Sequence, residues 1–327
     1  MIVTVPDESA VTRPSASTVA MDSSDEMNLT DLFTNIFVII DDIYNEIIPI
    51  GIRNRRNIKD SKLSDSEIIT ISIVGELLTI DSEKSFFSLL KREYKELFPR
   101  LGDRTRFNRT KRNLHLVISK IRGYISEFMQ LYSNNIRVID SMPIPVCEFG
   151  RAHFSKCFKG EASYGICASK KETYFGFKFH ALTTVDGFLT DYVITPANID
   201  DRNAVWDLCD KYRSISIIGD KGYINKRLTP ELKSERDIDL LFLKRANSRD
   251  NYPKEVRQLL FKVRRRIETS FSQLTEQLNL NKVKSKSMLG FMTRTSIKVL
   301  AHNISFLINK LMRNDDSMAK IKRLVFG

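Results

Sequence analysis

The chain has 327 residues, of which 42% are hydrophobic, and its formal net charge is +12. This composition is that of an ordinary globular protein with enough residues for two domains. Four cysteines exclude a disulfide-stabilised scaffold of this size, and the lack of an apolar run of ~18 residues excludes a membrane-spanning helix. The excess of positive charge predicts an anionic partner, either nucleic acid or a membrane surface. The alternative is a basic protein without a polyanion partner.

The charge is unevenly distributed along the chain. Residues 253–327 contain 16 basic and 5 acidic side chains, whereas residues 1–27 contain one Arg and five acids. Residues 1–27 are rich in Ser, Thr, Asp and Pro, which predicts a disordered acidic tail. Residues 313–327 are expected to form a basic C-terminal tail. The start of the chain lacks the pattern of a signal peptide, so we expect a cytoplasmic protein with reduced thiols.

Residues 28–130 have a helical pattern and are expected to form an all-α N-terminal domain. Ser64 to Glu67 have the spacing of a capping box before an apolar run, a second helix is expected over residues 83–97, and a third begins after Asp103. Its cationic face suits DNA binding in the helix-turn-helix manner. The alternative is a solvated basic face on a structural bundle. The candidate DNA contacts in this helix are Arg104, Arg106, Arg109, Lys111 and Arg112.

From residue 135 the pattern changes to strands mixed with helices, which predicts an α/β domain over residues 135–312. Asp186-Gly187 predicts a tight turn between two strands of a hairpin. A helix over 229–236 is expected to have Thr229 as its cap. The longest helix is expected to begin at Pro253, which suits the first turn of a helix. Strands are predicted over 136–146 (with its following loop), 174–185, 187–194, 214–219 and 237–244, and helices over 200–212, 229–236, 253–280 and 293–312.

Three acidic residues stand out by position. Asp140 and Asp220 each end an apolar strand-like run, and Glu268 lies within the long helix after Pro253. Two strand-end aspartates and one helix glutamate are suited to hold a pair of Mg²⁺ ions, which prefer carboxylate oxygens. Each acid also has a structural alternative: the aspartates as turn formers, and Glu268 as the partner of Arg264 one helical turn away.

The blocks around these acids resemble a DDE transposase of a bacterial insertion sequence, most similarly the 982 family. The matching blocks are Val138 to Ser141, Gly219 to Tyr223 and Arg264 to Phe271. The resemblance implies a ribonuclease-H-like mixed sheet with flanking helices, in which Asp140, Asp220 and Glu268 are catalytic and bind two Mg²⁺ ions, with Mn²⁺ as a substitute.

The resemblance also implies an activity and partners. The protein would bind the terminal inverted repeats of its element, hydrolyse the element end and join the freed 3′ hydroxyl to target double-stranded DNA. Synapsis of two ends implies a homodimer, and the DNA partner implies association with the nucleoid. A metal-dependent nuclease of the same fold and a catalytically inactive domesticated DNA-binding protein remain as alternatives.

One part of the family pattern is only partly kept. Related transposases often place Tyr, Arg, Glu and Lys at set spacings on the last catalytic helix, and here these positions read Phe261, Arg264, Glu268 and Thr275. Arg264 is expected to bind a phosphate near the cut, or to orient Glu268.

Further basic residues are candidate DNA contacts. Lys178 and His180 alternate on one face of a strand, which is expected to look toward the active site or the DNA. The basic stretch after the Glu268 helix is expected to contact phosphates, with solvated surface as the alternative. The candidates outside the helical region are Lys178, His180, Lys221, Arg264, Arg265, Lys282, Lys284, Lys286 and Arg294.

Overall fold

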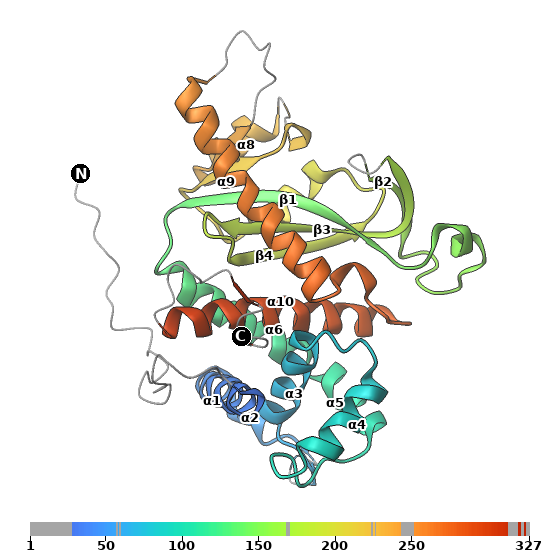
Figure 1. The fold of residues 1–327 in the computed structure, drawn as a ribbon. Coiled ribbons are helices and arrows are strands. Elements are labelled where there is room, and N and C mark those ends of the chain that lie inside the picture. Colours follow the sequence, from blue (N-terminus) through green and yellow to red (C-terminus); the bar gives the residue numbers. More distant parts are fainter. Residues whose placement is uncertain are drawn as a thin grey trace.

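Figure 1 shows the fold in a computed structural model, which describes residues 28–56, 58, 60–167, 171–223, 225, 227–242, 252–312, 320–321 and 324. The predicted tail 1–27 lies outside the described residues. Of the predicted tail 313–327, only residues 320, 321 and 324 are described.

The first part of the described chain is helical, as predicted. Ser64 and Glu67 form the expected capping box, with Ser64 Oγ accepting from the Glu67 N–H at 3.1 Å. The third predicted helix is instead two helices, which meet at Leu114. The helices are α1 Leu29–Ile47, α2 Ile50–Arg53, α3 Asp65–Leu77, α4 Glu83–Glu93, α5 Arg104–Asn113 and α6 His115–Gln130.

A six-stranded mixed sheet follows, which confirms the α/β fold class. Its order is β2-β3-β1-β5-β6, and β4 also pairs with β3. The β1–β3, β2–β3 and β3–β4 pairs are antiparallel, while β1–β5 and β5–β6 are parallel. The strands are β1 Ile136–Pro145, β2 Ser163–Cys167, β3 Glu172–Thr184, β4 Leu189–Pro196, β5 Ser216–Gly219 and β6 Asp239–Phe242. Strand β2 was not predicted.

Short helices connect these strands, and two long ones follow. Several predicted bounds were wrong: the helix expected over 200–212 is a 3₁₀ turn plus five helical residues, and α8 begins before Thr229, so Thr229 is not its cap. Pro253 precedes α9 instead of lying in its first turn. The elements are η3 Phe149–Phe154, η4 Asp201–Asn203, α7 Ala204–Leu208, η5 Lys221–Tyr223, α8 Leu228–Arg236, α9 Lys254–Ser272, the π-helical η6 Gln273–Gln277, η7 Leu280–Lys282 and α10 Met288–Leu311.

The predicted turn at Asp186-Gly187 joins β3 to β4 and also supports α9. Gly187 has φ +95°, a left-handed conformation that favours glycine. Ser270 of α9 donates from Oγ to the Gly187 carbonyl oxygen at 2.7 Å, and a Cβ on Gly187 would lie 2.8 Å from that Oγ. The hairpin turn therefore fixes the position of α9 along the sheet.

The sheet buries both faces. Ile139 and Ile217 point into a core formed with α7 and α8, while Ile218 packs against Leu260 of α9 on the opposite face. Helix α10 lies between the sheet and the N-terminal helices, packed against α3 and α6 (Figure 1). Among the described helices, none combines the length and hydropathy needed to cross a bilayer.

Candidate active site

The site lies where two parallel strands separate. Strands β1 and β5 pair from Ile136 to Val138 and from Ser216 to Ile218. Asp140 is two residues beyond the last paired residue of β1, and Asp220 is two beyond that of β5. Asp140 does not end its strand, since β1 continues to Pro145 and pairs there with β3. The divergence of the strands leaves both carboxylates at one opening in the sheet.

Helix α9 covers this opening and supplies a cation. Leu260 and Val263 pack on Ile218, which places the next turn of α9 above the aspartates. Arg264 Nη2 lies 3.8 Å from Asp140 Oδ2, and Arg264 Nη1 lies 3.5 Å from Asp220 Oδ1. One guanidinium therefore spans the two predicted catalytic carboxylates. Its planar fork suits such double contact.

Asp140 is the more deeply buried of the two aspartates, with 19% of its side chain exposed against 41% for Asp220. The pKa of Asp140 is raised to about 6, chiefly by burial and to a smaller extent by the neighbouring carboxylates Asp220 and Asp201. The Ser141 N–H, which donates to Asp140 Oδ1 at 2.8 Å, and Arg264 act in the opposite direction.

Asp201 is a third carboxylate of the site, and it was not predicted. Its Oδ2 accepts from Ser141 Oγ at 3.1 Å, and its Oδ1 accepts from Lys178 Nζ at 2.9 Å. Lys178 Nζ also donates to the Ile199 carbonyl at 2.8 Å. Asp201 was missed because residues 200–212 were predicted to form a helix outside the site. Its place shortly after β4 is the signal that could have found it.

Lys178 and His180 face this acidic site. His180 is fully buried, its Nε2 lies 2.9 Å from Thr195 Oγ1, and its Nδ1 lies 3.9 Å from Asp201 Oδ1. Burial lowers the pKa of His180 to about 4, although Asp201 acts to raise it. The imidazole is therefore neutral near pH 7, and no DNA phosphate can reach a fully buried ring.

Glu268 lies one turn of α9 beyond Arg264, on the same side of the helix, and its side chain is exposed. Within the part of the chain that the structure describes, no group of three or more His, Cys, Asp and Glu side chains is arranged to hold a metal ion. The meeting of all three predicted carboxylates therefore stays a prediction.

The donors present fit a divalent ion in their chemistry. Asp140 and Asp220 offer hard carboxylate oxygens on a rigid sheet, and they share a positive group, the guanidinium of Arg264. The two aspartates thus contact the same guanidinium, and Glu268 lies one helical turn from it as the third candidate.

The other candidate DNA contacts fall into separate places. Arg106 donates to the Asp60 carbonyl at 3.2 Å, Arg109, Arg265 and Lys282 are exposed, and the side chain of Lys221 lies outside the described residues. The remaining candidates line one cavity of about 480 Å³: Arg104, Lys111, Arg112, Lys284, Lys286 and Arg294.

Residues 131–288 match the family described as the transposase DDE domain, and this span contains Asp140, Asp201, Asp220, Arg264 and Glu268. No curated protein and no solved structure matches the chain. Together with the mixed sheet and its flanking helices, the match supports a DDE transposase with a ribonuclease-H-like domain.

Proposed function

We propose that this protein is a DNA transposase of an insertion sequence, of the 982 family, which hydrolyses the element end and joins it to target DNA. The observation that carries the proposal is the pair Asp140 and Asp220 at the opening between β1 and β5, within the span that matches the transposase DDE domain. Two carboxylates brought to one point by parallel strands suit catalysis on a phosphodiester.

In the proposed site, Asp140, Asp220 and Glu268 hold two Mg²⁺ ions, or Mn²⁺ in their place. When bound, such ions activate the attacking oxygen and stabilise the leaving oxygen of an in-line displacement. Glu268 is on α9, so a turn of its exposed side chain toward Asp140 and Asp220 would complete the carboxylate set.

Other side chains of the site position these groups. Asp201 orients Ser141, which follows Asp140 on β1, and Lys178 of β3, which pairs with Pro143 of β1. The Ser141 N–H fixes one oxygen of Asp140 and leaves the other toward Arg264. Arg264 would exchange its carboxylate contacts for a phosphate oxygen of the bound strand, a geometry that guanidinium groups favour.

The proposed reaction has two displacements. Water forms a bond to phosphorus at the element end, and the bond from phosphorus to the 3′ oxygen breaks, which leaves a 3′ hydroxyl and a 5′ phosphate. That hydroxyl then forms a bond to a target phosphorus, and one target phosphodiester bond breaks. The second step conserves the number of phosphodiester bonds and needs no external energy source.

We further propose the domain roles expected from the sequence. Residues 28–130 supply much of the recognition of the element ends, residues 135–312 carry catalysis, and a homodimer holds two ends together. Arg106, Arg109, Arg265, Lys221 and Lys282 remain proposed DNA contacts. For His180 we propose a positioning role instead, because its ring is buried.

One assay tests the proposal, with labelled element-end DNA, a target plasmid and Mg²⁺. We expect joined products from the wild type. Asp220→Ala should abolish joining and preserve end binding, because it removes a metal ligand without altering the DNA-binding surface.

Asp201→Asn should slow joining by about 10–100-fold, as loss of a supporting carboxylate typically does. Asp210→Asn is the matched control, since the exposed Asp210 pairs with Arg236 of α8 and not with a residue of the site.

Each contrary result has a defined meaning. Undiminished joining by Asp220→Ala would remove Asp220 from the site. Cut products without joined products would replace the proposal with a metal-dependent nuclease of the same fold. End binding without any product would leave a DNA-binding protein that has no catalytic role.

A further inference from the structure

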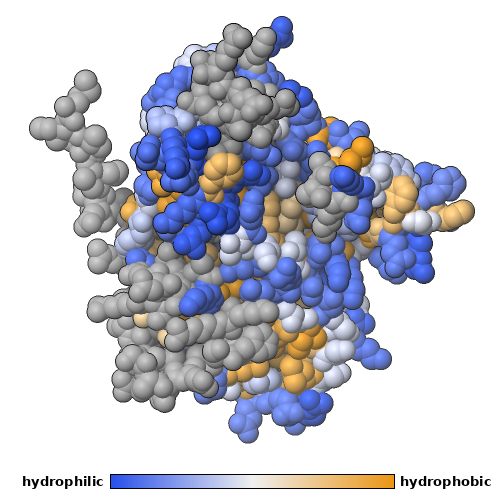
Figure 2. Space-filling model, turned by 45° about the horizontal axis from the view of Figure 1, so that its top comes forward, coloured by the Kyte–Doolittle hydropathy of each residue, from blue (hydrophilic) through white to orange (hydrophobic). Residues whose placement is uncertain are grey.

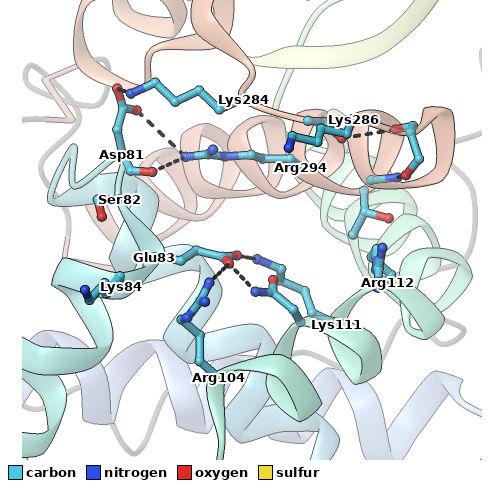
Figure 3. Close-up of a pocket in the computed structure, with 15 residues that line it drawn as sticks. Asp81, Ser82, Glu83, Lys84, Arg104, Lys111, Arg112, Lys284, Lys286 and Arg294 are labelled. Carbon is cyan, nitrogen blue, oxygen red and sulfur yellow. Dashed lines mark hydrogen bonds and ion pairs between the residues drawn. The ribbon is translucent and has the colours of Figure 1, made fainter. Parts of the chain in front are cut away.

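A basic cavity lies between the helical region and the segment that leads into α10. Its volume is about 480 Å³. It is lined by the six candidate DNA contacts already named for it, together with Lys84, against only two acidic side chains, Asp81 and Glu83. Figure 3 shows these side chains around the cavity, contributed by α4, α5, α10 and the segment before α10. Residues about 200 positions apart in the chain thus form one positive surface.

Some of the cations are held by ion pairs that shape the cavity wall. Lys111 contacts Glu83, and Lys284 Nζ lies 3.3 Å from Asp81 Oδ2. Arg294 donates from Nε to Glu76 Oε1 at 3.0 Å. These contacts link α4 to α5 and α10 to α3. The charges of these three basic side chains are partly neutralised. They therefore hold the cavity wall together and are less available to bind a ligand.

Three cations remain available for a ligand. Lys84, Arg112 and Lys286 are exposed, line the cavity, and have no ion-pair partner within the described parts of the chain. They belong to three different segments, α4, the end of α5 and the segment before α10 (Figure 3). A ligand that contacts all three must carry several negative charges across the cavity.

Two helix N-termini add to the positive potential. Ser82 caps the 11-residue α4 and Ser287 caps the 24-residue α10, and both residues line the cavity. The first-turn N–H groups of a helix carry partial positive charge and favour anions. The helix ends therefore reinforce the side-chain charges, and both favour phosphate-like ligands.

We propose that this cavity binds consecutive phosphates of a DNA backbone, independently of base sequence. The proposal rests on the proposed function, because it assigns one part of the DNA-binding surface of the transposase. A polymer backbone fits better than a free phosphate, since the cavity is far larger than one phosphate and its free cations come from three segments. The cavity also follows the proposed catalytic helix, as α9 continues through η6 and η7 to Lys284.

The chain placement gives the proposed contact a role. DNA held in the cavity would be anchored both to the helical region and to the segment that ends the matched domain at residue 288. Figure 2 shows hydrophilic side chains over much of one face of the molecule, with hydrophobic patches between them. Because Lys284 and Lys286 follow α9 in the chain, DNA bound in the cavity would be held at a defined position relative to α9, whatever its base sequence.

The test is the salt dependence of DNA binding. The full chain is titrated onto a short labelled duplex of unrelated sequence by fluorescence anisotropy, over a range of KCl concentrations. For Lys84→Ala/Arg112→Ala/Lys286→Ala we expect weaker binding. The slope of log affinity against log salt should also be smaller by about 0.9 for each lost phosphate contact. A triple variant of equal charge on the α7–α8 side, Lys211→Ala/Arg213→Ala/Lys233→Ala, should keep the wild-type slope.

Two further arms decide between outcomes. Lys84→Arg/Arg112→Lys/Lys286→Arg should retain the wild-type slope, because it keeps the charges. Pyrophosphate should compete only weakly with the duplex at equal ionic strength. Three results would overturn the proposal. The first is an unchanged slope for the cavity variant, and the second is an equal loss of slope in the control triple variant. The third is that the cavity variant loses pyrophosphate binding but keeps duplex binding.

These outcomes are separate from those of the joining assay. If the wild type joins ends normally but the cavity variant keeps the wild-type slope, the proposed function stands and the DNA-binding role of the cavity is wrong. If the cavity variant shows the expected loss of slope but the wild type makes no products, the cavity binds DNA and the proposed transposase activity is wrong.

Discussion

Asp140 combines burial with neighbouring negative charge, and this gives its carboxyl group a pKa of about 6. Arg264 and the Ser141 N–H offset part of that effect. The negative charge of Asp140 is therefore energetically unfavourable in the proposed site until a cation binds beside it. A carboxylate in such a position is typical of functional sites.

The raised pKa predicts a pH effect on stability. Between about pH 4 and 6 the native state holds a proton that the unfolded chain has released, so the stability contributed by this group falls as pH rises through that window. In the absence of divalent ions, Asp140→Asn should be more stable than the wild type above pH 6, by up to about 3 kcal/mol. The difference should shrink toward pH 4.

Urea unfolding between pH 4 and pH 8 measures this difference. Asp239→Asn, on the exposed first residue of β6, controls for the loss of a carboxylate as such and should show no comparable gain. A constant difference between Asp140→Asn and wild type across this range would contradict the assigned cause.

At the scale of elements, the sheet and α9 were predictable where local chemistry decides. The capping box of α3 and the Asp186-Gly187 turn are local patterns, and both formed as expected. The helix predicted over 200–212 was wrong, because the chain there forms η4 and the five-residue α7, which packs against β4. The helix predicted over 229–236 formed as α8, which begins one residue earlier. The long helix after Pro253 ends in a π-helical turn, which no periodicity of apolar residues signalled.

The contact between the hairpin turn and α9 gives a stability prediction. Gly187 and Gly160 both have positive φ, at +95° and +87°, but only Gly187 faces a neighbour at Cβ distance. Gly160→Ala should cost about 1 kcal/mol from backbone strain. Gly187→Ala should cost about 1–2 kcal/mol more, because it also displaces the Ser270 hydroxyl from the Gly187 carbonyl.

Thermal or urea unfolding of the two variants tests this comparison, and Gly160→Ala serves as the matched control for backbone strain. Equal costs for the two variants would show that Ser270 moves aside freely. The hairpin turn would then not hold α9 in place.

For the whole molecule, α10 joins the two ends of the described chain. Lys298 of α10 is fully buried and contacts Glu76 of α3 and the Leu278 carbonyl. Burial lowers the pKa of Lys298, and Glu76 acts against that shift. Arg294 contacts the same carboxylate. One carboxylate therefore pairs with two cations between the helical region and α10, and Arg294 has Asp81 as a second partner.

This arrangement predicts unequal effects of two isosteric changes. Glu76→Gln leaves the buried Lys298 without its hydrogen-bonded carboxylate, and should destabilise the fold by about 3 kcal/mol or more. Lys298→Met leaves Glu76 paired with Arg294, and should change stability by only about 1 kcal/mol. Urea unfolding compares the two. A larger loss for Lys298→Met would show that the ammonium group, and not its partner, holds α3 to α10.

The sequence by itself determined the mixed α/β class, most of the helices, and the placement of Asp140 on a strand, Asp220 directly after a strand and Glu268 on a helix, because local patterning and turn chemistry act over a few residues. Only the tertiary structure decided that Asp201 joins Asp140, that Arg264 spans the two aspartates, and that α5 shares a cavity with Lys284 and Lys286. These contacts depend on strand pairing and helix packing between residues about 40 to 180 positions apart. No local pattern specifies such distances.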